Sequence, residues 1–215
     1  VRRLTSGLGF ADYEGIYLPN GDIMFSSTRC VQNVDCWHVS VCNMYLMNKN
    51  GKYMRRIGYD QVHTNYPQVH PRNGLVTYTR WEYNDRGQIY PQPLFRMYPN
   101  GAQQTEYYGT NSYFPTTSLH ARGIPGTGKV LAVLSGHHTR QRGKLGVIDP
   151  SKGRQETSGV TLVAPVQELH GIIKIDKYGQ GGDQWQYPYP LDEENYLVTF
   201  RPNGEKRFGI YFMNK

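Results

Sequence analysis

Two series of glycine-containing turns recur along the sequence at the same interval. The first series centres near residues 21, 74 and 127, and the second near residues 51, 101 and 153. Both advance by fifty to fifty-three residues, a period typical of blade-type repeats. In the first series, Asn20-Gly21 and Asn73-Gly74 favour the positive φ angles that a two-residue hairpin requires. The interleaved series therefore predict antiparallel hairpins in a repeating unit of four strands.

This repeating unit indicates an all-β fold. Four antiparallel strands per repeat, with no helical periodicity in the sequence, are typical of the blade of a β-propeller. The composition agrees, because the 215 residues include 24 Gly, 13 Pro and 18 Tyr. A β-sandwich is the structural alternative, but it does not predict such regular spacing. We therefore expect a β-propeller with four-stranded blades, of which about four are present.

The chain 1–215 is predicted to be one propeller domain or a portion of a larger propeller. Blade-like repeats are expected at 10–59, 68–108, 116–162 and 187–214, with an insertion at 167–186. The last repeat lacks a fourth strand, whereas residues 1–6 resemble a fourth strand without its blade. These two pieces could complete one sheet and close a four-bladed ring. We favour a window cut from about six to eight blades, because four-bladed rings are at the small limit of the architecture.

The turn pattern also predicts which end of the propeller carries function. The tight glycine turns all fall at one end of the blades, where the first-to-second and third-to-fourth connections lie. The long polar connections fall at the other end: Cys30–Cys42, Gln61–Pro67, Arg80–Gln92, Asn111–Pro115 and Gly136–Gly143. Loops on a rigid scaffold commonly carry binding and catalytic residues. We call this second end the loop face and expect the functional site there.

The loop face gathers histidine, arginine and tyrosine side chains. The candidate catalytic residues are His63, Arg80, Tyr83 and His137, and the candidate ligand-binding residues are Tyr66, Glu82, Tyr113, His138 and Arg140. Such a set at a channel mouth could bind a carboxylate and abstract a proton beside it. The alternative is a polar funnel lined by aromatic rings and hydrogen-bonded histidines, without catalysis. For His70 and His120, expected on first strands, buried and hydrogen-bonded imidazoles are the default.

Three cysteines, Cys30, Cys36 and Cys42, are separated by five residues each. With His38 they form a Cys3His set of the kind that zinc accepts, but this spacing matches no common zinc motif. We favour a Cys30–Cys36 disulfide with Cys42 buried over a structural metal. The sequence contains no C-x-x-C-H haem attachment motif, phosphate loop or dinucleotide fingerprint, so no cofactor is identified.

The net charge of +7 arises from 24 Lys and Arg against 17 Asp and Glu. The cations are scattered, with tight pairs such as Arg2-Arg3 and Arg55-Arg56. This pattern favours ordinary solvated surface charge over binding of a polymer. If the protein does bind a polymer, an acidic glycan is favoured over nucleic acid. No apolar run approaches the length that spans a bilayer, so no membrane span is expected.

Several phrases of the sequence are similar to the propeller region of proteins related to the hydrazine synthase alpha subunit: FSSTRC, DQVHTNYPQV, RWEY, EYYGTNSY and SGHH. More distantly, the chain resembles TolB-like propellers, whose blades end on an arginine-rich strand similar to VRRLT. The resemblance implies a β-propeller in an extracytoplasmic protein, either periplasmic or secreted. It also implies subunits of a larger haem complex as partners. Haem redox chemistry is not implied for this chain, because C-x-x-C-H is absent.

Three functional hypotheses follow. The first is a propeller that binds a ligand, such as a small molecule, or a partner protein through its loop face. The second is a polysaccharide lyase that acts on a uronate-containing glycan by β-elimination. In that reaction Arg80 or Arg140 would neutralise the uronate, and His63 or His137 would act with Tyr83 as base and acid. The third is a structural subunit of a haem redox complex.

Overall fold

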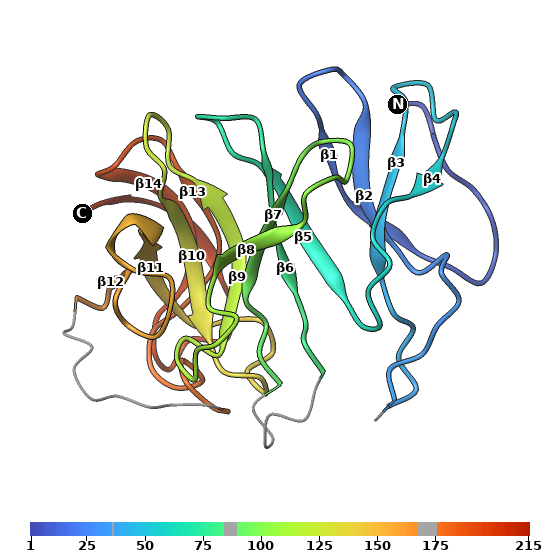
Figure 1. Ribbon diagram of the computed structural model, residues 1–215. Coiled ribbons are helices and arrows are strands. Elements are labelled where there is room, and N and C mark those ends of the chain that lie inside the picture. Colours follow the sequence, from blue (N-terminus) through green and yellow to red (C-terminus); the bar gives the residue numbers. More distant parts are fainter. Residues whose placement is uncertain (36, 84–89, 167–175) are drawn as a thin grey trace.

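The computed structural model describes residues 1–35, 37–83, 90–166 and 176–215. Within these residues the strands form four antiparallel sheets, and in each sheet consecutive strands are neighbours. Figure 1 shows the sheets following one another across the molecule in chain order, as the blades of a propeller do. The predicted all-β propeller with about four blades is confirmed.

The first two sheets each contain four strands. The first is built from β1 (Asp12–Tyr17), β2 (Ile23–Ser27), β3 (Asn43–Met47) and β4 (Arg55–Arg56). The second is built from β5 (Thr64–Val69), β6 (Val76–Arg80), β7 (Leu94–Met97) and β8 (Thr105–Tyr108). The predicted hairpin glycines have positive φ, 83° at Gly21 and 70° at Gly74. The turn chemistry of the sequence therefore sets both hairpins.

The third sheet has four strands and the last has three. The third is built from β9 (Thr117–Gly123), β10 (Val130–Ser135), β11 (Lys144–Ile148) and β12 (Val160–Ala164). A short 3-10 helix, Pro150–Lys152, follows β11 and precedes β12. The last sheet is built from β13 (Gln184–Pro190), β14 (Asn195–Arg201) and β15 (Gly209–Asn214). It lacks a fourth strand within the described residues, as expected.

Two first strands begin earlier than the sequence predicts. Strand β5 starts at Thr64 rather than Gln68, so Tyr66 lies within a strand and not in the crossing between blades. Strand β13 starts at Gln184, inside the segment 167–186 that is predicted to be an insertion, of which residues 167–175 lie outside the described chain. In both strands a proline lies where the pairing register shifts. Proline is tolerated at such bulges, so it does not end these strands.

Each of the four first strands carries one such bulge. The pairing with the second strand shifts register once in every sheet. At each bulge a residue other than glycine has positive φ: 57° at Glu14, 55° at Tyr66, 52° at His120 and 43° at Tyr187. A bulge re-aims the side chain that it carries. The four residues are therefore equivalent positions of the repeat, and we call them the bulge residues.

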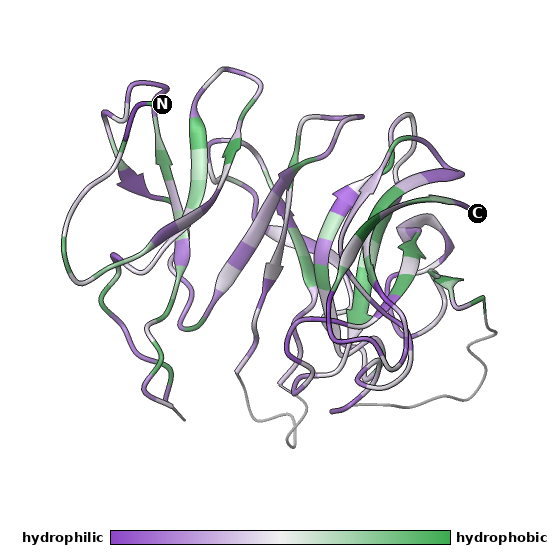
Figure 2. Ribbon diagram, turned by 180° about the vertical axis from the view of Figure 1, so that it is seen from behind, coloured by the Kyte–Doolittle hydropathy of each residue, from purple (hydrophilic) through white to green (hydrophobic). Residues whose placement is uncertain are grey.

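The hydrophobic core lies between successive sheets. Side chains from neighbouring sheets share three clusters: the first and second, the second and third, and the third and fourth. Strands β2, β3 and β10 are buried along their whole length. In Figure 2 the hydrophobic segments lie mostly on the strands. No helix of the described chain has the length and apolarity needed to cross a bilayer.

Residues 1–6 form no strand in the structure. Leu4 instead packs against the outer side of the first sheet, in a cluster with Ile23 and Phe25. The two ends of the chain lie at opposite sides of the molecule in Figures 1 and 2. The segment is therefore placed beside the first sheet and not against β15; its assignment to another blade stays a prediction.

The core between the third and fourth sheets predicts a strong dependence of stability on Leu131. This side chain is fully buried in the shared cluster, so Leu131→Ala leaves a cavity between two blades. We expect the free energy of unfolding, measured by urea denaturation, to fall by about 2–5 kcal/mol. The matched control is Leu8→Ala, because Leu8 is 98% exposed, and its effect should stay within about 0.5 kcal/mol. Equal effects of the two variants would contradict the blade packing.

Candidate functional site

The bulge residues contact one another from sheet to sheet. Oε2 of Glu14 accepts hydrogen bonds from the backbone N–H of Tyr66 at 2.7 Å and from the Ser26 hydroxyl at 2.9 Å. The Tyr66 ring meets the His120 ring edge-on, with centroids 4.5 Å apart. The His120 ring stacks on Tyr187 at 3.9 Å. These contacts join all four first strands, and we call the four residues the axial chain.

Burial governs the electrostatics of the axial chain. It raises the pKa of the Glu14 carboxyl and of the Tyr66 hydroxyl, because both lose hydration of their charged forms. Burial, with a smaller effect of Arg122, lowers the pKa of His120 to about 3. His120 Nδ1 accepts from the Tyr187 N–H at 3.4 Å, so this histidine is neutral, as the default expectation had it. The interior of the propeller thus holds His120 uncharged.

Six aromatic rings gather on the loop face around Trp81. The His63 ring stacks on Trp81 at 5.5 Å, and the His137 ring lies 5.3 Å from it. Tyr83 meets Trp81 edge-on at 5.5 Å and stacks on Tyr90 at 4.9 Å. His138 lies against His137 at 4.6 Å. We call these six residues the aromatic cluster. The structure thus brings His63, Tyr83 and His137 together from three loops, while their catalytic role stays a prediction.

The tautomer of His63 follows from its hydrogen bonds. Nδ1 of His63 lies 3.1 Å from the backbone nitrogen of Cys42 and 3.2 Å from its Sγ. A backbone N–H can only donate, so Nδ1 accepts and the neutral ring carries its proton on Nε2. Burial lowers the pKa of His63, which favours this neutral form. His63 therefore offers an N–H donor on Nε2, and its basic lone pair is already engaged by Cys42.

Arg80 is held by carboxylates of its own chain. Its Nε lies 3.1 Å from Asp60, and a terminal nitrogen lies 3.8 Å from Glu82. The guanidinium also covers the Phe95 ring, 4.7 Å from its centroid. Burial raises the pKa of Asp60, although the Arg80 and Arg56 charges oppose this. Because Asp60 and Glu82 already balance its charge, Arg80 has little capacity to neutralise an acidic ligand. Glu82, which is predicted to bind ligand, is here an ion-pair partner of Arg80.

A second group of cations has no carboxylate partner among the described residues. It consists of Arg140 and Arg142 in the loop Gly136–Gly143, and Arg201 at the end of β14. Burial, and then the charges of Arg201 and Arg140, lower the pKa of Arg142. The Nε atoms of Arg142 and Arg201 are buried with no hydrogen-bond partner in the described chain. We call these three residues the arginine group.

The loop that carries this group is fixed to the axial chain. The Tyr66 hydroxyl donates to the side-chain oxygen of Gln141, and Gln186 Nε2 donates to the Gln141 carbonyl at 2.9 Å. Arg140 and Gln141 both have φ of 56°, so the backbone is strained at this point. His137 and His138 belong to the same loop as Arg140 and Arg142, so this loop carries members of both the aromatic cluster and the arginine group.

Three predicted ligand-binding residues have contacts outside the aromatic cluster. His138 Nδ1 lies 2.6 Å from the Asp176 carboxylate, and its side chain is exposed. Tyr113 is also exposed, and its backbone N–H donates to Glu156 at 2.9 Å. Tyr66 stands in the axial chain and not in the crossing. Among the described residues no ring contact joins Tyr113 to the aromatic cluster, so its binding role stays a prediction.

The cysteine predictions fall partly outside the described chain. Cys30 and Cys42 carry free thiols, and Cys42 is buried as expected. Burial raises the pKa of Cys42 to about 12, so its thiol is inert as a nucleophile. Cys36 is not among the described residues, and the Cys30–Cys36 disulfide lies outside them with it. The described residues, including the exposed His38, show no group of three metal-ligating side chains.

Sequence reasoning missed several residues of this region. Trp81 occurs in the phrase RWEY but received no role, although its ring is the centre of the aromatic cluster. Arg201 was missed because it ends β14, far in sequence from the loop Gly136–Gly143. Glu14 and Tyr187 were missed because a β-bulge, unlike a hairpin turn, is not marked in the sequence by a characteristic dipeptide such as Asn-Gly. The recurrence of a polar or aromatic residue at the blade interval is the signal that could have found them.

Comparison with known proteins supports the fold. No protein-family model and no curated protein matches this sequence. Hydrazine synthase of Kuenenia stuttgartiensis is similar in structure with a TM-score of 0.68 and 18% identity, over 90% of this chain and 26% of that chain. TolB from Acinetobacter baumannii is similar with a TM-score of 0.50 and 14% identity, over 99% and 45% of the two chains.

This chain therefore spans less than half the length of either solved structure. At these identities the likeness concerns the fold alone. It shows that the chain has a β-propeller fold, as these two proteins do. The resemblance stated from the sequence phrases is thus confirmed at the level of the fold.

The buried His120 predicts a loss of stability in acid. Unfolding returns its pKa from about 3 to about 6.5, so the unfolded chain binds a proton that the folded chain does not. The free energy of unfolding should therefore fall as pH falls from about 6.5 toward about 3. In His120→Phe, which keeps a ring between Tyr66 and Tyr187, this slope should decrease by up to about 1.4 kcal/mol per pH unit.

Urea unfolding of both proteins between about pH 7.5 and pH 4.5 measures the difference. His38→Phe is the control, because the His38 side chain is exposed, and its curve should remain parallel to that of the unmodified protein. If the His120→Phe curve is also parallel, the assignment of a neutral buried imidazole is wrong.

Proposed function

We propose that this protein is a β-propeller binding module that holds an acidic glycan on its loop face without cleaving it. The arginine group carries this proposal. Two of its Nε–H donors are buried and unpaired within the described chain, and burial, followed by the like charges of Arg201 and Arg140, lowers the pKa of Arg142. An anion at this position would relieve the repulsion and accept both donors. A uronate carboxylate has the charge and the planar shape that guanidinium groups bind.

The aromatic cluster supplies the second half of a glycan site. A sugar ring has one flat apolar face and hydroxyl groups around its edge. Rings such as Trp81 and His137 offer surface for the flat face. Trp81 Nε1 and His137 Nδ1 are both buried without a partner among the described residues, so each is available to a hydroxyl. Burial and the neighbouring His138 lower the pKa of His137, which keeps its ring neutral.

The geometry argues against His63 as the base of a β-elimination, and His137 is the base that the lyase alternative would use. The elimination needs a base with a free lone pair beside the acidic C–H of the uronate. The Nδ1 lone pair of His63 is engaged by Cys42, and its Nε2 carries a proton in the neutral ring. Arg80, one of two predicted counter-ions for the uronate, is already paired with Asp60. Arg140 remains available to bind the carboxylate, which serves a binding site equally well.

Two further predictions concern the location of the protein and its assembly with other subunits. An extracytoplasmic location is supported by the resemblance to the hydrazine synthase alpha family and agrees with a glycan as ligand. A role as a structural subunit of a haem redox complex rests on that resemblance alone. No contact of the described residues favours it over glycan binding.

Charge removal from the arginine group should weaken glycan binding. We expect Arg140→Gln and Arg142→Gln each to raise the dissociation constant for polygalacturonate about tenfold, measured by titration calorimetry. Arg207→Gln is the matched control, because Arg207 is exposed on the hairpin between β14 and β15 and bears the same charge. Its affinity should not change. Methyl-esterified pectin, which has the same sugar without the charge, should bind weakly to all of these proteins.

Ultraviolet absorbance of the same mixtures tests cleavage, because β-elimination creates an unsaturated uronate. The proposal expects binding with no rise in absorbance. A rise that depends on His63 or His137 would establish the lyase instead. Equal binding of the charged and the esterified polymer would show that the arginine group does not bind the ligand.

The aromatic cluster makes a separate prediction. Trp81→Phe keeps an aromatic ring against His63 but loses the Nε1–H donor. We expect affinity for polygalacturonate to fall about fivefold, the effect of one hydrogen bond worth about 1 kcal/mol. Trp37→Phe is the control, because Trp37 is exposed in the loop between β2 and β3. Equal effects in both variants would show that Trp81 does not contact the ligand.

A further inference from the structure

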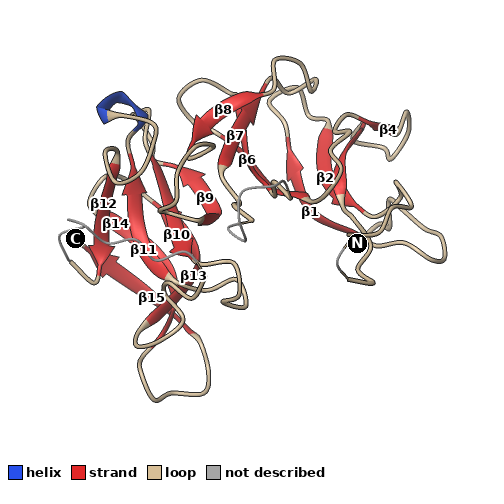
Figure 3. Cartoon of the chain, turned by 60° about the horizontal axis from the view of Figure 1, so that its bottom comes forward, coloured by secondary structure: helices blue, strands red, loops and turns tan. Residues whose placement is uncertain are grey.

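A cavity lies between the second and third sheets, at the end of the blades opposite the loop face. We call this end the turn face, because the hairpins β1–β2, β5–β6 and β9–β10 lie there (Figure 1). Figure 3 shows the second sheet beside the third. The cavity has a volume of about 220 Å³, and its lining includes Arg72, Leu75, Thr77, Arg96, Tyr107 and Gly128. It is therefore built from two complete four-stranded sheets.

Two of the lining residues stand at positions that are apolar in the other complete sheets. The second residue of each second strand pairs with a residue of the third strand in the same register. These pairs are Met24 with Leu46 in the first sheet, Thr77 with Arg96 in the second, and Leu131 with Val147 in the third. In the first and third sheets the paired side chains are at most 9% exposed, because the next blade packs on them.

The second sheet thus has a hydroxyl and a guanidinium where the other two sheets have core side chains. Thr77 is 2% exposed, so the exchange lies inside the molecule and not on its surface. A polar or charged group at a core position reduces stability unless it is paired or has another role. The exchange therefore indicates a site, provided that the charge has no partner within the protein.

The two guanidinium groups of this cavity have no such partner. Neither Arg72 nor Arg96 lies within ion-pair distance of a carboxylate in the described chain. Arg72 reaches across to the third sheet, because a Cβ on Gly128 would lie 3.4 Å from Arg72 Nη1. The Tyr107 hydroxyl donates to the carbonyl of the same Gly128 at 2.7 Å. Burial raises the pKa of Tyr107, and the charge of Arg96 opposes this rise, so both arginines act near Gly128.

The other titratable groups nearby do not change this charge. His70 also lines the cavity, and its Nδ1 accepts from the Arg72 backbone N–H at 3.3 Å. Its Nε2–H donates to the Lys129 carbonyl at 3.2 Å, and burial lowers the pKa of His70, so the ring is neutral. Asp149 has cations of its own: the Ser151 hydrogen bond, and then the charges of Lys129 and Lys152, lower its pKa. The cavity therefore keeps the two positive charges of Arg72 and Arg96.

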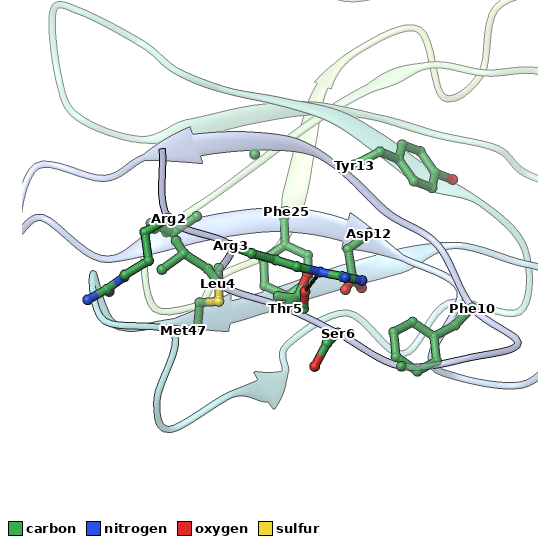
Figure 4. A pocket seen from close by; sticks show the side chains of 13 residues that line it. Arg2, Arg3, Leu4, Thr5, Ser6, Phe10, Asp12, Tyr13, Phe25 and Met47 are labelled. Carbon is green, nitrogen blue, oxygen red and sulfur yellow. Dashed lines mark hydrogen bonds between the residues drawn. The ribbon is translucent and has the colours of Figure 1, made fainter.

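Two other cavities show the balanced alternative. The corresponding cavity between the first and second sheets, of about 280 Å³, is lined by Arg55 and also by Asp22. Asp22 follows the hairpin glycine, and Leu75 stands at the same position in the second sheet. The groove of Figure 4, of about 480 Å³, likewise contains a carboxylate, and Arg3 extends along it toward Asp12. In both of these cavities, an arginine of the lining is accompanied by a carboxylate.

We propose that the cavity between the second and third sheets binds the phosphate group of a small ligand, with Arg72 and Arg96 as its counter-charges. A phosphate monoester carries a charge of about −1.5 to −2 at neutral pH, so it balances two arginines, whereas one carboxylate does not. Guanidinium groups bind phosphate oxygens with paired hydrogen bonds. The Thr77 hydroxyl of the lining can add a third.

The size of the cavity limits what the phosphate is attached to. A volume of about 220 Å³ equals that of about seven water molecules in the liquid. It is smaller than the pockets of about 300 Å³ or more that enclose drug-sized ligands. The ligand is therefore inorganic phosphate or a small organic phosphate. This site is separate from the glycan site, because it lies at the opposite end of the blades.

Titration calorimetry above about pH 7.5, where phosphate is mostly a dianion, tests the charge and the source of the ligand. Inorganic phosphate and glycerol 3-phosphate represent the two sources, and the one that binds more tightly identifies the source. We expect acetate to bind at least about tenfold more weakly than either, because it carries one charge. Equal affinity for acetate, or no binding of either phosphate, would overturn the proposal.

Two variants transfer residues of the first sheet to the second. Leu75→Asp introduces the carboxylate that Asp22 supplies there, and Arg96→Leu introduces the side chain of Leu46. We expect each to raise the dissociation constant for the tighter phosphate about tenfold or more. Arg55→Gln is the matched control in the corresponding cavity, and its affinity should not change. Leu75 is partly exposed on its hairpin, so Leu75→Asp remains informative if Arg96→Leu misfolds.

The same variants separate this site from the glycan site. Arg142→Gln should leave phosphate affinity unchanged, and Leu75→Asp should leave polygalacturonate affinity unchanged. Failure of glycan binding would therefore not affect the phosphate result, nor the reverse. If phosphate binding is lost in Arg142→Gln and kept in Leu75→Asp, the phosphate occupies the arginine group and the proposed cavity is wrong.

Discussion

The propeller depends on the contact that each first strand makes with the next through its bulge. Residues other than glycine at positive φ cost about 1–3 kcal/mol each, and four of them occur at equivalent positions. The strain is offset because each bulge directs a side chain onto the neighbouring first strand. Glu14 accepts from the Tyr66 backbone, Tyr66 meets His120, and His120 stacks on Tyr187. The sheets are thereby held at their inner edges, while apolar side chains fill the space between their faces.

The same residue type has different consequences in different parts of the loop face. Arg80 and Arg142 are both partly buried residues of the loop face. Arg80 has Asp60 and Glu82 within ion-pair distance, so its charge is cancelled inside the protein. Arg142 has other arginines as neighbours, so its charge is uncompensated in the described chain. The counter-ion, and not the presence of arginine, determines where an anion is bound.

This distinction explains how much the sequence could predict. Turn chemistry is local, so Asn20-Gly21 and Asn73-Gly74 revealed the hairpins, the blade interval and the face on which His63 and His137 meet. Bulges and ion pairs depend on the neighbouring strand or blade. The segment Gln61–Pro67 was therefore predicted to be a connection, although Pro67 stands at a bulge inside β5. Arg80 was predicted to neutralise a uronate, although it is paired with Asp60. The partnership of Arg142 with Arg201 joins different blades, so no local pattern could show it.

The proposed glycan site uses the loop ends of the second, third and fourth sheets, where His63, His137 and Arg201 lie. Arg201 ends β14, and its terminal nitrogen donates to the Gln184 side chain of β13. The Tyr66 hydroxyl donates to Gln141, between Arg140 and Arg142 in the loop Gly136–Gly143. The bulge that carries Tyr66 therefore both joins neighbouring first strands and positions the loop on which two of the three arginines lie.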